Sequence, residues 1–251
     1  MPPWSRLPAL RRIGLDYFIR AGIARPDTPA PAGIVDDPRA LTDEAMHPAV
    51  RAFFVDTASQ VLIVESRWAW WARWWWRLAR RWFVRVGQLT PPLDGTTMHT
   101  AMVALDDARE GRPGARGVLR THDDGAPMQV VAYAVVRGPD GPLLSVCFPT
   151  PLGALTGLLR VVPLGAHGVT LSARGAGAGV FLRAFGAQLR TPLGETMSLW
   201  PSEICGCPLD IDVALHPEAE LVGAHAQTLF GAVMVRHRYW FVPRAVYRSG
   251  R

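Results

Sequence analysis

The sequence contains no lysine, so all 27 of its basic residues are arginines. They outnumber 21 acidic residues, and the net charge is +6. Only 19% of the residues are charged, which is below the quarter that is typical of soluble domains. Guanidinium groups bind phosphate and carboxylate through two parallel hydrogen bonds. A basic surface of this kind suits an anionic membrane or a nucleic acid.

Cysteine is also scarce, with only Cys147, Cys205 and Cys207. This number is too small for a disulfide framework, so we expect a reducing, cytoplasmic compartment. Cys205 and Cys207 lie near Asp210 and His216, all of which are potential metal ligands. Zinc sites more often use Cys-x2-4-Cys with a second pair of ligands. A tight glycine turn therefore explains Cys-Gly-Cys better, and we predict no metal and no cofactor.

Long apolar runs are missing as well. None reaches the roughly 18 residues that a membrane-spanning helix requires. Arg160 interrupts the run from 151 to 162, and His225 and Gln227 interrupt a later one. Arginines also interrupt the apolar positions at the start of the chain, unlike those of a signal peptide. We expect a protein that does not span a membrane but that can lie against its inner face.

Strand signals dominate the sequence from residue 55 onward. Segments rich in β-branched and aromatic residues recur about every ten residues and are joined by Gly/Pro turns. Gly138-Pro-Asp-Gly141 predicts a hairpin. The predicted fold is α+β and predominantly antiparallel β, a curved sheet or open barrel partly covered by an amphipathic helix. Strands are predicted over residues 60–65, 96–105, 117–122, 129–137, 143–148, 168–173, 179–191, 195–200, 209–215 and 228–242.

The N-terminal part of the chain has a different composition. An amphipathic pattern predicts a helix over residues 5–23, and four prolines predict an extended linker over residues 25–40. A further helix is predicted over residues 42–54, with Thr42 as its N-cap. We therefore divide the chain into residues 1–45, a helical arm with a proline-rich linker, and residues 46–251, a β-rich domain.

Residues 68–86 contain seven of the ten tryptophans. The apolar residues recur at helical spacing, and the arginines gather on another face, which predicts a helix. The predicted apolar stripe consists of Trp71, Trp74, Trp75, Leu78 and Trp82, and the predicted basic face consists of Arg73, Arg77, Arg80 and Arg81.

This helix has three interpretations. In the favoured one the stripe packs on the sheet and the arginines face solvent, because core burial explains most amphipathic helices. In the second the helix lies on a membrane, with tryptophans at the headgroups and arginines on anionic lipid. In the third it binds nucleic acid by stacking and phosphate contacts. No nucleic-acid module is visible elsewhere, so we do not expect a nucleic-acid partner.

Few residues suggest catalysis. His122 lies beside Asp123 and Asp124, and a histidine next to carboxylates can act as a general base. A solvated turn is the favoured interpretation, and no Gly-x-Ser-x-Gly nucleophile elbow is present. Glu195 and Glu203 are a possible carboxylate pair, but surface carboxylates are common.

His237 and Tyr239 share one face of a predicted strand. They can line a pocket or lie on the wetter side of the sheet, and we favour the second. The sequence therefore predicts no catalytic centre. The candidates for an enzyme would be His122, Asp124 and His237.

Several phrases carry a resemblance to a known family. They are Met46-His-Pro-Ala-Val-Arg51 with Phe53-Phe54, Arg85-Val-Gly-Gln-Leu89, Leu189-Arg-Thr-Pro-Leu193, Leu229-Phe-Gly-Ala-Val-Met-Val235, and Tyr239-Trp-Phe241. Together they resemble a bacterial domain of unknown function found at the C-terminus of YndJ-type proteins, over about residues 46–243. The resemblance implies a β-rich domain and transfers no catalytic residue.

These observations favour a non-enzymatic binding domain for an apolar or amphiphilic, lipid-like small molecule. In this hypothesis the sheet supplies an apolar cavity and the tryptophans cover its mouth. The arginines hold an anionic headgroup or the membrane surface. The alternatives are a small-molecule enzyme, and a peripheral membrane or protein-interaction module that acts through the Trp- and Arg-rich helix.

Overall fold

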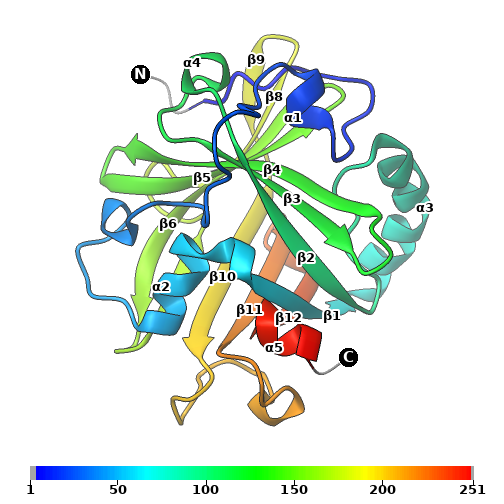
Figure 1. The fold of residues 1–251 in the computed structure, drawn as a ribbon. Coiled ribbons are helices and arrows are strands. Elements are labelled where there is room, and N and C mark those ends of the chain that lie inside the picture. The colour runs from blue at the N-terminus through cyan, green and yellow to red at the C-terminus, as the bar shows by residue number, and fades with distance from the viewer. Residues whose placement is uncertain (1–3, 250–251) are drawn as a thin grey trace.

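In the computed structural model, which describes residues 4–249, the chain folds into a closed antiparallel barrel (Figure 1). Its sheet has twelve strands in the order β5-β4-β3-β2-β1-β12-β11-β10-β7-β6-β8-β9, and β6 also pairs with β5. The ten strands from β5 to β6 therefore form a ring. The β8–β9 hairpin extends outward from β6.

The strands have the following bounds. They are β1 (Gln60–Trp68), β2 (Gly95–Ala104), β3 (Arg116–His122), β4 (Pro127–Gly138), β5 (Gly141–Thr150), β6 (Gly153–Leu164), β7 (Gly168–Ser172), β8 (Gly179–Ala184), β9 (Ala187–Arg190), β10 (Leu193–Pro201), β11 (Leu221–Leu229) and β12 (Ala232–Pro243). The helices are α1 (Tyr17–Arg20), α2 (Pro48–Val55), α3 (Trp70–Val86), α4 (Asp107–Glu110) and α5 (Arg244–Ser249), with 3-10 turns at Pro38–Ala40, Thr57–Ser59 and Val213–Leu215.

The predicted fold class is confirmed, and the barrel is closed rather than open. The strand predicted over residues 209–215 is wrong. This segment is a loop whose apolar residues, among them Ile211 and Val213, pack against Trp240 on the outside of the barrel. Strands β6 and β11 were not predicted. Most of β6 is buried on both faces, so its residues form an apolar run instead of an alternating pattern.

One end of the barrel is closed by α2. Phe53 and Phe54 point into the interior, where the ring of Phe53 meets that of Phe241 at 5.5 Å. The helix begins at Pro48, later than predicted, because proline favours the first helical position. Thr42 is therefore not its N-cap.

The N-terminal arm packs on the outside of the barrel instead of forming the helix predicted over residues 5–23. Only α1 is helical, and Gly14 has a φ of +70°, which ends any regular helix before it. Tyr17 and Phe18 are fully buried, and Phe18 covers Gly117 of β3. The linker over residues 25–40 is also anchored, since its Ile34 reaches the main core.

A buried ion pair joins α4 to the barrel wall. The side chains of Glu110 and Arg112 are 0% and 1% exposed. Arg112 Nε donates to both carboxylate oxygens of Glu110, at 2.9 and 3.0 Å, and Arg112 Nη1 donates to Ser145 Oγ at 2.6 Å. Each charge is therefore compensated inside the fold.

Between residues 4 and 249, none of the helices combines the length and the apolar character needed to cross a membrane.

Candidate functional site

The helix predicted over residues 68–86 is confirmed as α3, which lies against one side of the barrel (Figure 1). It ends at Gly87, whose φ of +70° is left-handed. The arm is tied to this end, because Ile13 N donates to Val86 O at 2.7 Å and Gly14 N donates to Gly87 O at 3.1 Å. The helix is thus held at both of its ends, by β1 and by the arm.

The face of α3 that docks on the barrel is not the predicted stripe. Trp76 stacks on Trp68 of β1, with ring centroids 5.5 Å apart and 7° between the planes. Its Nε1 donates to Pro91 O at 3.3 Å. Ala72 and Val86 are buried on this face. The ring of Trp76 and the smaller side chains of Ala72 and Val86 therefore form the face of α3 that packs against the barrel.

The predicted stripe faces away from the barrel, and the favoured interpretation of a packed stripe is therefore wrong. Trp71 is half-buried. The other members are 49% to 67% exposed, and Trp70 beside them is 85% exposed. Soluble domains rarely gather so many apolar rings on one surface, and such patches usually mark a contact with a partner or a membrane.

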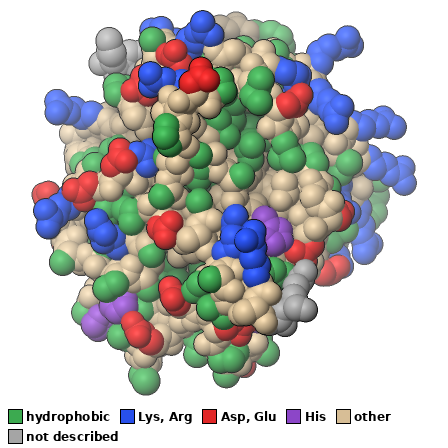
Figure 2. Space-filling model, viewed as in Figure 1, with side chains coloured by type: hydrophobic (Ala, Val, Ile, Leu, Met, Phe, Trp, Pro, Cys, Tyr) green, Lys and Arg blue, Asp and Glu red, His purple; other side chains and the backbone are tan. Residues whose placement is uncertain are grey.

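Arginines share this outward surface. Arg77 and Arg81 are exposed, whereas Arg73 pairs with Asp94 at 2.7 Å and Arg80 is half-buried. In Figure 2 basic side chains project along the edge at which Figure 1 places α3. We call this surface the Trp–Arg face, and it consists of Trp70, Trp74, Trp75, Arg77, Leu78, Arg81 and Trp82.

A hollow of about 520 Å³ lies between α3 and the ends of β2, β3 and β4. His122 and Asp124 both line it, together with Asp123 and Arg80. His122 Nδ1 lies 3.3 Å from Thr96 Oγ1, and burial lowers the pKa of His122. The structure thus brings together two of the three catalytic candidates around a space of ligand size.

The contacts of Asp123 and Asp124 also fit the solvated turn that the sequence favoured. Asp124 Oδ1 accepts from Ala126 N at 2.9 Å, and Asp123 Oδ1 lies 2.8 Å from His99 Nε2. Serine, cysteine and lysine are not among the residues that line this part of the described structure. The hollow is therefore large enough to hold a small molecule beside His122 and Asp124.

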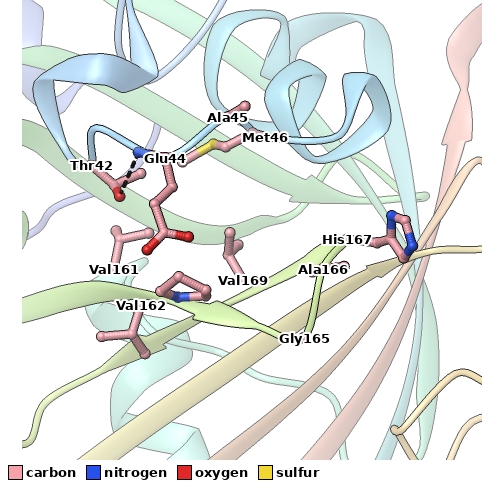
Figure 3. A pocket seen from close by; sticks show the side chains of 12 residues that line it. Thr42, Glu44, Ala45, Met46, Val161, Val162, Gly165, Ala166, His167 and Val169 are labelled. Carbon is pink, nitrogen blue, oxygen red and sulfur yellow. Dashed lines mark hydrogen bonds between the residues drawn. The ribbon is translucent and has the colours of Figure 1, made fainter.

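A second hollow, between the approach to α2 and the β6–β7 hairpin, is much smaller at about 30 Å³. Figure 3 shows Glu44 reaching into it from the loop in which Glu44 N donates to Thr42 Oγ1 at 3.3 Å. Ligand sites usually measure several hundred Å³. This space therefore suits only water.

The third catalytic candidate, His237, lies inside the barrel. Its Nδ1 is 2.8 Å from Ser66 Oγ on β1. His225, opposite it on β11, has Nδ1 at 3.1 Å from Tyr239 OH and Nε2 at 3.0 Å from Glu195 Oε1. The interior therefore contains a polar cluster, which consists of Ser66, Glu195, His225, His237 and Tyr239.

The expectation that His237 and Tyr239 lie on the wet side of the sheet is wrong. They are 4% and 7% exposed. Both alternate along β12 with the outward-facing Arg236 and Arg238, and this period of two was the signal for an inward face. Glu195 and Glu203 do not form a pair, since Glu203 lies 3.4 Å from His47 instead.

The burial of His237 makes stability depend on pH. Burial, aided by the neighbouring His225, lowers the pKa of His237 to about 3. In the unfolded chain the pKa is about 6.5. As the pH falls below 6.5, only the unfolded state takes up this proton, so folding stability is lost at about 1.4 kcal/mol per pH unit.

We expect the free energy of unfolding to lose about 2 kcal/mol from this group between pH 6.5 and pH 5. Urea unfolding at pH 7 and pH 5 measures it. His237→Asn keeps a hydrogen-bonding group beside Ser66. Its free energy of unfolding should no longer show the loss of about 2 kcal/mol that His237 causes between pH 6.5 and pH 5. The exposed His167 serves as the control, because His167→Asn should keep it. Identical pH dependence in wild type and His237→Asn would contradict the assignment.

The Cys-Gly-Cys segment is a surface turn. Cys205 is exposed, Asp210 pairs with Arg238 at 2.5 Å, and His216 lies 3.3 Å from Glu218. Across the part of the chain that the structure describes, no three His, Cys, Asp or Glu side chains gather in a geometry that could hold a metal ion.

The chain is 24% identical to the "uncharacterized membrane protein YndJ" of Bacillus subtilis (strain 168), over 94% of the chain and 42% of that relative. The chain is similar to YndJ. This match confirms the resemblance to YndJ-type proteins, and the chain spans about two fifths of the relative's length. No protein-family model and no solved structure matches the chain.

Proposed function

We propose that this protein is a non-enzymatic module that attaches reversibly to the surface of an anionic membrane, on its inner face, through the Trp–Arg face of α3. The observation that carries the proposal is the outward direction of the tryptophans on a helix that is itself firmly docked. An alternative protein partner would use the same surface. The mixture of rings and arginines favours lipid, because each kind of side chain has a place in the headgroup region.

The expected energies are sufficient for reversible binding. A tryptophan ring that moves half of its surface out of water contributes about 2 kcal/mol to the free energy of membrane binding. Each arginine near an anionic surface adds about 1 kcal/mol. The name of YndJ also supports the proposal, since it describes that relative as a membrane protein.

Removal of one exposed ring tests the proposal. Trp75→Ser should weaken binding to vesicles of phosphatidylcholine with 30% phosphatidylglycerol by about tenfold or more, because about 2 kcal/mol of ring burial is lost. Cosedimentation with a lipid titration measures the change. A blue shift of tryptophan emission in the wild type should accompany binding.

The matched control is Leu215→Ser, which removes an apolar side chain of similar exposure, 59%, from a loop far along the chain from α3. It should leave vesicle affinity unchanged. Wild-type protein that stays in the supernatant at all lipid concentrations would overturn the proposal. Equal losses in Trp75→Ser and Leu215→Ser would show that α3 is not the membrane contact.

A further inference from the structure

The hollow beside α3 contains two opposite charges that do not neutralise each other. Arg80 lines the hollow from α3, and Asp124 lines it from the turn between β3 and β4. Neither side chain forms an ion pair with a residue between 4 and 249. Asp124 Oδ1 accepts from Ala126 N at 2.9 Å, which leaves Oδ2 without a partner in the described chain. One wall therefore presents a guanidinium to the hollow, and the other presents a carboxylate.

A neutral imidazole lies near both charges. His122 Nε2 is 3.4 Å from Thr90 Oγ1, and His122 Nδ1 is 3.3 Å from Thr96 Oγ1. Burial lowers the pKa of His122. The negative charge of Asp124 opposes this shift and the positive charge of Arg80 adds to it, so both groups lie within electrostatic range of the ring. Because its pKa is lowered, His122 adds no charge to the hollow at pH 7.

The remaining residues that line the hollow leave this balance of charge almost unchanged. Asp123 faces away toward His99, with Asp123 Oδ1 2.8 Å from His99 Nε2. Val84, Ala126 and Pro127 add apolar surface. An anionic molecule in the hollow would be repelled by Asp124, and a cationic one would be repelled by Arg80. A molecule that carries both charges would be attracted by both walls.

The hollow lies at the flank of the Trp–Arg face. Val84 lines the hollow, is 55% exposed, and follows Arg81 by three residues on the helix. Residues three apart are neighbours on a helix surface, so Val84 separates the hollow from the exposed arginines of that face. If α3 lies on a membrane with its arginines at the headgroups, the hollow is at the depth of the headgroups as well.

We propose that the hollow binds a zwitterion made of a phosphodiester and a primary ammonium group, as in the headgroup of phosphatidylethanolamine. The phosphodiester pairs with Arg80, and the ammonium donates to the carboxylate of Asp124. A volume of about 520 Å³ is sufficient for such a headgroup. Recognition of the lipid rests on the proposed membrane attachment of α3, whereas binding of the free headgroup requires only the hollow.

The first test uses the full chain and two soluble headgroups, glycerophosphoethanolamine and glycerophosphocholine, in isothermal titration calorimetry. The wild type should bind the ethanolamine compound about tenfold more tightly, because the three methyl groups of choline remove the N–H donors that Asp124 accepts. Arg80→Met should weaken the binding of both compounds by about tenfold. Arg85→Met, which removes an exposed arginine of α3 outside the hollow, should change neither affinity.

A matched pair of variants tests the carboxylate. Asp124→Asn keeps an oxygen that can accept from Ala126 N, and it should weaken binding of glycerophosphoethanolamine by about tenfold. The control is Asp212→Asn, because Asp212 is also exposed and its Oδ1 also accepts from the second residue onward, Ala214 N, at 2.9 Å. It should keep the wild-type affinity. Thermal unfolding of both variants should stay at the wild-type value.

The second test distinguishes lipid from the free headgroup. In vesicles with a constant share of phosphatidylglycerol, exchange of phosphatidylcholine for phosphatidylethanolamine should strengthen wild-type binding severalfold. Asp124→Asn should lose this gain. On vesicles without phosphatidylethanolamine it should bind at least as tightly as the wild type, since it has one negative charge less. A damaged barrel would not produce both results. Asp212→Asn should keep the gain.

Three results would each overturn the proposal. They are failure of the wild type to bind glycerophosphoethanolamine, equal affinity for the two soluble compounds, and unchanged binding in Asp124→Asn. Binding of the soluble compound without a gain on vesicles would support the site with the free headgroup as its ligand. Absence of wild-type vesicle binding, with binding of glycerophosphoethanolamine intact, would contradict only the membrane function. Trp75→Ser should reproduce that separation, because Trp75 does not line the hollow.

Discussion

Replacement of Glu110 by glutamine is expected to lower the free energy of unfolding by about 3 to 5 kcal/mol. The substitution keeps the shape of the side chain but leaves Arg112, which is 1% exposed, without its counter-ion. The guanidinium keeps only neutral acceptors such as Ser145 Oγ. Because water cannot reach the charge, its desolvation is no longer offset. Urea unfolding at pH 7 measures the change.

Two controls isolate the cause. Asp140→Asn removes one member of an exposed pair, with Arg160 at 3.3 Å, and should cost less than about 1 kcal/mol. The double replacement Glu110→Gln/Arg112→Met removes both charges and should recover most of the loss, since a buried pair contributes little net stability. A double variant as unstable as the sum of its single changes would contradict this account.

Reversal of two charges on α3 should have an equally large effect on membrane binding. Arg77→Glu/Arg81→Glu changes the charge of the Trp–Arg face by four units. At about 1 kcal/mol per charge near an anionic leaflet, binding should weaken by about a thousandfold. Both side chains are exposed, so folding stability should not change. Cosedimentation with vesicles that contain phosphatidylglycerol measures the loss.

The matched control is Arg137→Glu/Arg174→Glu, which lowers the net charge from +6 to the same +2 at exposed sites outside α3. It should change binding only slightly. Salt provides a second check, because about 0.5 M salt shortens electrostatic range and should weaken wild-type binding but not the residual binding of the α3 variant. Equal losses in the two double variants would mean that net charge, rather than α3, attracts the membrane.

Local signals in the sequence predicted local structure. The turn Gly138-Pro-Asp-Gly141 sets the β4–β5 hairpin through its own backbone preferences, so the hairpin was predictable. Closure of the barrel was not predictable, because it depends on β1 pairing with β12, whose paired residues are 167 to 183 positions apart in the chain. No period or turn in either strand identifies its distant neighbour. The arm was misassigned because an irregular segment that anchors Leu7, Ile13 and Phe18 has the same apolar spacing as a helix.

The same distinction applies to the candidate sites. The 3.6-residue period predicted α3, but tryptophans occur around much of the helix, and periodicity cannot say which ring docks. Trp76 docks because Trp68 offers a stacking partner on β1.

The pairing of β1 with β12 also has a consequence for synthesis in the cell. Gln60 lies opposite Pro243, so the ring of strands cannot close until the ribosome has released almost all of β12. The β2–β5 meander can pair much earlier, because its strands are neighbours in the chain. In the interval β1 exposes a hydrogen-bonding edge that a chaperone must shield or that another nascent chain can occupy. Strands β1 and β12 are therefore the region where slow folding and aggregation would concentrate.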